Sequence, residues 1–264
     1  LPLVEVGLYP QTELEELPES FQLPSQELKQ CIDMTLFAAQ TNESRKNLMG
    51  VNLSSKEGKQ TRWLATDGHR LAQMLKPAEG VRFENVPEVI IPRKALSEIR
   101  KAIDLFGGDV LISFDDRVMQ FVGEQISFKT RLIEGKFPNC DPIIPKDNHI
   151  VATVERDRLV SALRVVSSIN YEKLKPVKLT LTGGSLKLES EKAEYGEVSD
   201  AIEAEYQGED FQVGFNSRYL LDALGVMQSD KVQLEFKNPM SPSILRAVND
   251  TEYLSVIMPL RIEW

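Results

Sequence analysis

The stretch "SQELKQCIDMTLFAAQ" (residues 25–40) is the first of two similar segments that decide the fold. Its apolar side chains recur every three or four residues, at Leu28, Ile32, Leu36 and Ala39. That spacing is typical of an amphipathic helix. A second stretch, "VERDRLVSALRVVSSI" (residues 154–169), repeats the pattern. Segments of alternating polarity follow each helix: "MGVNLSS" and "RWLATD" after the first, and the hairpin "VKLTLTGGSLKLES" after the second.

A second helix follows in each half. In "IPRKALSEIRKAIDLFGG", Pro92 suits a first helical turn and two glycines suit its end. In "FNSRYLLDALGVM", Asn216 is a favoured N-cap residue. We therefore expect helices over 24–40, 92–106, 154–171 and 216–228. Further strands are expected over 107–114, 118–123, 126–135, 230–236, 243–248 and 252–262. The order of elements recurs at an offset of roughly 120–130 residues, a typical domain length. This predicts an α+β fold of two tandem copies, each with two helices on one side of antiparallel sheets.

The boundary between the copies is expected in "FPNCDPIIPKDNH" (residues 137–149), because three prolines interrupt regular structure there. Residues 21–146 and 147–264 are then the two domains. Residues 1–20 are acidic and proline-spaced, and are expected to be a connector with at most one edge strand. The chain begins at Leu1 without a methionine, which indicates a fragment.

The composition is that of a globular protein, with 264 residues, 42% hydrophobic and 27% charged. No apolar run is long enough for a membrane span, and no signal peptide is seen. Cys31 and Cys140 lie far from each other and from any metal-binding spacing, so they are expected to be reduced thiols. The net charge of −9 argues against binding to nucleic acid unless basic residues cluster locally.

Basic residues do concentrate in the expected helices. These hold nine basic and seven acidic residues, a net charge of +2, which leaves −11 for the rest of the chain. If all four helices share one surface, that surface is mildly basic on an acidic body. Solvated helix faces explain the same pattern, and both explanations stay open.

The stretch "LATDGHRLAQ" (residues 64–73) places His69 beside an Asp-Gly turn. The only other histidine is His149, so a metal site is not expected. A catalytic triad is not expected either, because Asp67 and His69 share one turn and no nucleophile elbow is present. No phosphate-binding loop occurs. His69 is therefore either a structural turn residue or part of a binding-pocket wall.

Five segments, "LATDGHRLA", "IPRKALSEI", "RLIEGKFPN", "FNSRYLLDAL" and "VIMPLRI", together resemble the bacterial sliding clamp family, the beta subunits of DNA polymerase III. They occur in the family's order and spacing across nearly the whole chain. Family chains contain three copies of the DNA-clamp (processivity-fold) domain. This sequence is similar to the second and third copies only.

The resemblance implies a processivity factor without catalytic activity, metal or cofactor. Family members form head-to-tail homodimeric rings around duplex DNA and slide without reading its sequence. Short peptide motifs dock the replicative polymerase alpha subunit, the clamp loader, repair polymerases and mismatch-repair proteins. The implied location is cytoplasmic and nucleoid-associated. The implied DNA-facing residues are Lys29, Asn42, Arg93, Lys94, Arg100, Lys101, Arg158 and Arg164.

The resemblance also implies a partner-peptide pocket between the two domains. Its implied residues are Arg45, Leu48, Thr66, Gly68, His69, Arg70, Leu71, Pro138, Ile143, Met240, Ser243, Val256, Ile257, Met258, Pro259, Leu260 and Arg261. The apolar members would receive leucine and aromatic side chains, and the arginines would be polar anchors at the rim. Two features depart from the family: Pro142 stands where a basic residue is common, and Glu263-Trp264 extend the chain.

An alternative function follows from the missing first domain. Without it the chain lacks half of the family's ring interface. It would then be an isolated peptide-binding scaffold that cannot encircle DNA.

Overall fold

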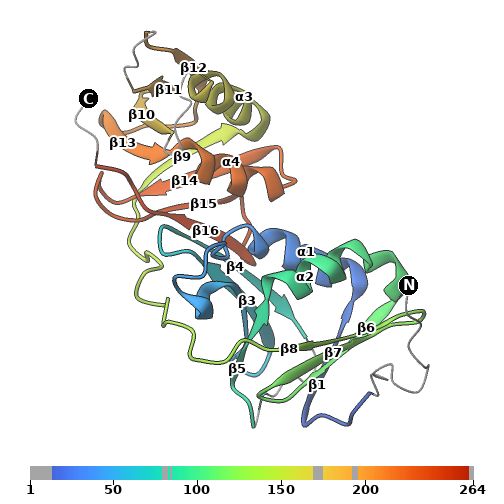
Figure 1. Ribbon diagram of the computed structural model, residues 1–264. Helices are drawn as coiled ribbons and strands as arrows, with labels where there is room; N and C mark the ends of the chain where they lie inside the picture. The colour runs from blue at the N-terminus through green and yellow to red at the C-terminus, as the bar shows by residue number, and fades with distance from the viewer. Residues whose placement is uncertain (1–13, 79–82, 84, 169–174, 192–195, 262–264) are drawn as a thin grey trace, which may run out of the picture.

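The computed structural model describes residues 14–78, 83, 85–168, 175–191 and 196–261 (Figure 1). Most of the expected connector, the last residues of the expected 154–171 helix, and Glu263-Trp264 lie outside the described residues. Both halves have the same order of elements: one strand, a helix, four strands, a second helix and three strands. The predicted α+β repeat is confirmed.

Four α-helices are present in the described part of the chain: α1 (Ser25–Leu36), α2 (Arg93–Lys101), α3 (Arg156–Ser167) and α4 (Ser217–Val226). Two short 3-10 helices accompany them, η2 (Lys46–Leu48) and η3 (Ile103–Phe106). The expected helix over 92–106 is therefore two elements. The Ala102 N–H is shared between the carbonyls of Glu98 and Ile99, which tightens the last turn of α2.

Two four-stranded antiparallel sheets lie one in each half. The first has the order β1 (Glu19–Pro24), β6 (Asp109–Phe114), β7 (Val118–Val122) and β8 (Ser127–Arg131). The second has the order β12 (Ser199–Glu203), β11 (Ser185–Ser190), β10 (Pro176–Thr182) and β13 (Phe211–Asn216). The predicted hairpin at Gly183-Gly184 is the β10–β11 connection, where Gly184 has φ +82°.

A third, eight-stranded sheet crosses from one half to the other. Its order is β5 (Glu88–Pro92), β2 (Gly50–Lys56), β3 (Gln60–Thr66), β4 (Arg70–Pro77), β16 (Tyr253–Ile257), β15 (Ser243–Ala247), β14 (Lys231–Phe236) and β9 (Ile150–Glu155). The halves meet where β4 pairs with β16, from Arg70 opposite Ile257 to Met74 opposite Tyr253. We call this pairing the seam.

Two expected strands end several residues before their predicted ends. The one over 126–135 ends at Arg131, after which the Ile133 N–H donates to the Ile90 carbonyl and the chain leaves its sheet. The strand over 252–262 ends at Ile257, which lies opposite Arg70, the first residue of β4. The next N–H, of Met258, donates to the His69 carbonyl in the turn before β4. Leu260 instead bridges to Gly214.

The eight-stranded sheet has a hydrophobic core on each face. The larger core fills the space under the helices and includes Trp63 and Ile257. The smaller one lies on the opposite face, where Phe137 and Cys140 of the connecting segment 132–149 pack on Leu71 and Val256. Helices and connecting segment thus cover opposite faces (Figure 1).

Candidate functional site

The turn between β3 and β4 is built by its own polar side chains. The Thr66 hydroxyl donates to the Arg70 carbonyl at 2.6 Å and accepts from the Gly68 N–H at 3.1 Å. Asp67 Oδ1 accepts from the N–H groups of His69 and Arg70, at 2.9 and 3.1 Å. These bonds are those of an Asx turn, which explains why Asp precedes Gly here.

Gly68 has φ +91°, a left-handed conformation that side chains disfavour. We expect Gly68→Ala to lower the free energy of unfolding by about 1–2 kcal/mol because of that strain. Urea denaturation measures the change. Gly225→Ala is the matched control, since this helical glycine has open space around it and alanine there should stabilise by about 0.5–1 kcal/mol. Equal changes in the free energy of unfolding for the two variants would contradict backbone strain at Gly68 as the cause.

Arg70 points inward rather than standing at a rim, with its side chain 11% exposed. Its Nε donates to Asp67 at 3.0 Å, its Nη1 to Asp222 of α4 at 2.6 Å, and its Nη2 to the Phe37 carbonyl at 2.9 Å. The guanidinium also lies 4.7 Å from the Tyr219 ring centroid and 5.4 Å from that of Phe37, which is cation–π geometry. The expected polar anchor is thus engaged within the protein.

His69 is exposed, and its ring lies nearly parallel to that of Tyr219, with centroids 6.3 Å apart. Burial and the negative charge of Asp67 raise the pKa of the Tyr219 hydroxyl. The histidine backbone belongs to the turn, whereas its ring faces α4 of the other half. Sequence reasoning missed both Tyr219 and Asp222 as neighbours of this turn.

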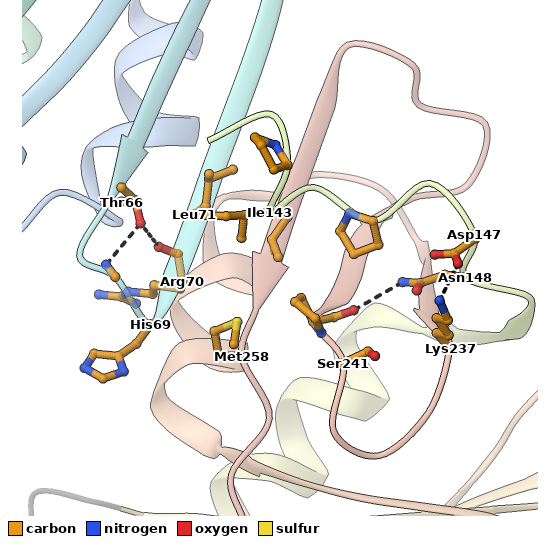
Figure 2. A pocket seen from close by; sticks show the side chains of 15 residues that line it. Thr66, His69, Arg70, Leu71, Ile143, Asp147, Asn148, Lys237, Ser241 and Met258 are labelled. Carbon is orange, nitrogen blue, oxygen red and sulfur yellow. Dashed lines mark hydrogen bonds and ion pairs between the residues drawn. The ribbon is translucent and has the colours of Figure 1, made fainter. Parts of the chain in front are cut away.

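A cavity of about 420 Å³ opens beside the turn, between the two halves (Figure 2). That volume is within the range of ligand-binding clefts. Eight of the expected pocket residues line it: Thr66, Gly68, His69, Arg70, Leu71, Ile143, Val256 and Met258. Pro142, noted above as a departure from the family, also lines it, and six further lining residues were not expected: Pro145, Asp147, Asn148, Lys237, Ser241 and Pro242. Prolines in the boundary segment and in the loop "NPMSPS" (residues 238–243) were a signal for Pro145 and Pro242.

The remaining expected pocket residues do not line this cavity. They are Arg45, Leu48, Pro138, Met240, Ser243, Ile257, Pro259, Leu260 and Arg261. Ile257 is 1% exposed and belongs to the larger core, because its side chain points to the opposite sheet face from that of Val256. Leu48 and Ser243 are buried, and Met240 is 54% exposed outside the cavity. Arg45 lies close to the turn: a Cβ atom placed on Gly68 would lie 3.5 Å from the Nη1 atom of Arg45.

The far end of the cavity is polar. Lys237 forms an ion pair with Asp147 at 2.5 Å, and this hydrogen bond lowers the pKa of the aspartate. Asn148 Nδ2 donates to the Glu235 carbonyl at 2.9 Å, which ties the connecting segment to β14. The cavity therefore has an apolar end with Leu71 and Met258 and a charged end at Lys237 (Figure 2). Val256, which pairs with Leu71 across the seam, lines the apolar end as well.

The expected DNA-facing residues lie on α1, α2 and α3, apart from Asn42 in the loop after α1. Asn42, Lys94, Arg100, Lys101, Arg158 and Arg164 are exposed, and Lys29 is half-buried. Arg100 pairs with Asp33, and Lys101 with Glu98.

Arg93 is half-buried, as Lys29 is, and its guanidinium is bonded to backbone carbonyls at the end of α1. Its Nη1 donates to the Leu36 and Ala39 carbonyls, at 2.8 and 3.3 Å. Burial lowers the pKa of its guanidinium, and the nearby charge of Arg70 lowers it further. This arginine therefore caps the C-terminal end of α1.

Among the described residues, no group of three His, Cys, Asp or Glu side chains is placed to hold a metal ion. Cys31 and Cys140 are buried and unbridged, and burial raises the pKa of both thiols. None of the helices in the described ranges is long and apolar enough to span a bilayer.

The chain matches known protein families over nearly its whole length. Residues 22–139 match the family "DNA polymerase III beta subunit, central domain", and residues 141–261 match the family's "C-terminal domain". The beta sliding clamp of Caulobacter vibrioides is 34% identical over 99% of this chain and 71% of that protein.

Solved structures agree with the sequence matches. A crystal structure of the C. crescentus beta sliding clamp superposes with a TM-score of 0.92 at 32% identity, over 99% of this chain and 70% of that one. The sliding clamp from Bartonella birtlesii, bound to griselimycin, gives a TM-score of 0.89 at 34% identity, over 96% of this chain and 69% of that one. The fold shared with these structures contains both halves and the seam.

Proposed function

Because the chain belongs to the bacterial DNA polymerase III beta subunit family, the beta sliding clamps, we propose that its interdomain cavity captures short peptide segments of partner proteins. The family function is that of a DNA sliding clamp, which tethers the replicase to duplex DNA. The alternative of an isolated peptide-binding scaffold that cannot encircle DNA is not favoured by these relatives. The partners proposed are the polymerase alpha subunit, the clamp loader, repair polymerases and mismatch-repair proteins.

One observation carries the proposal: the cavity has walls from both halves, with an apolar end. The turn that supplies Gly68 comes from the first half, and Val256 and Met258 come from the second. Leucine and phenylalanine side chains of a peptide would bury apolar surface there. Methionine adapts its shape to different side chains, which suits a site with several partners.

Several finer points belong to the same proposal. The chain acts without catalysis. Its helices face DNA with their exposed basic residues, which are Lys94, Arg100, Lys101, Arg158 and Arg164. Contacts of this kind go to phosphates and carry no sequence information, as a sliding protein requires. The domain boundaries at 21–146 and 147–264, the homodimeric ring, and the cytoplasmic, nucleoid-associated location remain proposals.

Fluorescence anisotropy with a labelled peptide that ends in a Leu-x-Leu-Phe motif tests the cavity directly. We expect a Kd in the micromolar range or tighter, about −8 kcal/mol of binding free energy. A peptide of the same composition in scrambled order is the control, and it should bind at least about tenfold more weakly because its anchors no longer match the apolar end. Equal binding of both peptides, or no binding by a chain with a folded circular dichroism spectrum, would contradict the proposal.

A further inference from the structure

We propose that Arg70 is a positioning residue which, with Asp222, locks helix α4 of the second half to helix α1 of the first. The lock keeps the two walls of the cavity at a fixed separation. The inference rests on the proposed peptide site, because it assigns a role to a residue in that site's wall. It also replaces the expected role of Arg70 as a polar anchor for the ligand.

The seam alone does not fix the angle between the halves. Backbone hydrogen bonds between β4 and β16 form a single line, and the twist between neighbouring strands varies over about −10 to −35° in proteins. Contacts away from that line are therefore needed to set the angle. Asp222 and Tyr219 of α4 and Phe37 at the end of α1 supply them on the helix side of the sheet.

Arg70 is suited to this role by its geometry. Three of its N–H donors bond to three separate elements: the turn through Asp67, α1 through the Phe37 carbonyl, and α4 through Asp222. Its planar group also contacts the rings of Phe37 and Tyr219, one from each half. A rigid, planar guanidinium can make all these contacts at once, whereas an ammonium group cannot.

The opposite end of the seam has its own ion pair. Lys76 Nζ lies 2.8 Å from Glu252, and the Leu75 N–H donates to the Glu252 carbonyl. These bonds remain when Asp222 is changed, and Arg70 keeps Asp67 as its charged partner. Loss of the Asp222 bond should therefore loosen the cavity end of the junction without unfolding either half.

The test compares Asp222→Asn with the unsubstituted chain in two measurements. Spin labels on Gln22→Cys in β1 and Gln212→Cys in β13, both exposed, report the distance between the halves by pulsed electron resonance. Cys31 and Cys140 are 0% and 2% exposed and should not react with the label. Without peptide, we expect Asp222→Asn to broaden the distance distribution. Anisotropy should show the Leu-x-Leu-Phe peptide binding about 5- to 20-fold more weakly, which lies in the lower part of the range of coupling between sites.

Asp157→Asn is the matched control, since Asp157 pairs with Arg156 inside the second half. It should leave both measurements unchanged. An unchanged distribution in Asp222→Asn would overturn the positioning role, even if peptide binding weakened. If the unsubstituted chain binds no peptide and Asp222→Asn still broadens the distance distribution, the lock is supported and the peptide site is contradicted. The two proposals can therefore fail separately.

Discussion

Replacing Phe137 with alanine is expected to lower the free energy of unfolding by about 3–4 kcal/mol, the usual cost of truncating a buried phenylalanine. Phe137 is 3% exposed, and it belongs to the smaller core on the outer face of the eight-stranded sheet. Its neighbours in that core include Leu71 of β4 and Val256 of β16, the two strands of the seam. The lost contacts would therefore weaken the junction of the halves.

Pro138→Ala is the control for this change, because the adjacent proline is exposed and should alter stability by less than about 0.5 kcal/mol. Urea denaturation followed by circular dichroism measures both variants. The connecting segment also carries Pro142 and Ile143 into the cavity wall. Phe137→Ala should thus weaken peptide binding while Pro138→Ala does not. A loss below about 1 kcal/mol for Phe137→Ala would contradict this prediction and would mean that the smaller core collapses to fill the space left by the ring.

Local elements were predictable because their patterns are local. The spacing of Leu28 and Ile32 predicted the buried face of α1, and the two glycines after Thr182 predicted the β10–β11 hairpin. The eight-stranded sheet was not predicted, since β4 and β16 lie far apart in the chain and both read as ordinary strands. The smaller core was missed for the same reason: proline-rich sequence indicated a boundary, but not that Phe137 anchors it.

In the candidate site too, the local turn was predictable from the sequence and the long-range contacts were not. An Asp-Gly pair predicted the turn, and the resemblance placed it in a pocket wall, where the cavity lies. Sequence could not show that Arg70 turns inward, because its partner Asp222 is 152 residues away on a helix face that looked merely solvated. Ile257 was misplaced because a stretch of apolar residues does not reveal which strand positions face the cavity.

Met258→Asp is expected to weaken binding of the Leu-x-Leu-Phe peptide by about 100-fold, which corresponds to about 2.7 kcal/mol. Met258 lines the cavity (Figure 2) and belongs with Leu71 and Val256 to its apolar lining. The change removes apolar contact surface from the peptide and leaves a carboxylate that binding would desolvate without a partner. Its backbone N–H still donates to the His69 carbonyl, so the turn should persist.

Two further variants separate this effect from a general one. Met258→Leu keeps the apolar volume and should change the Kd by less than about threefold. Met240→Asp introduces the same charge at a residue that the resemblance also implied, but whose side chain is 54% exposed outside the cavity. Anisotropy should show no weakening for it, because a solvated carboxylate costs nothing on binding. If Met240→Asp weakened peptide binding as much as Met258→Asp does, the peptide would lie over the "NPMSPS" loop and not in the cavity beside the turn.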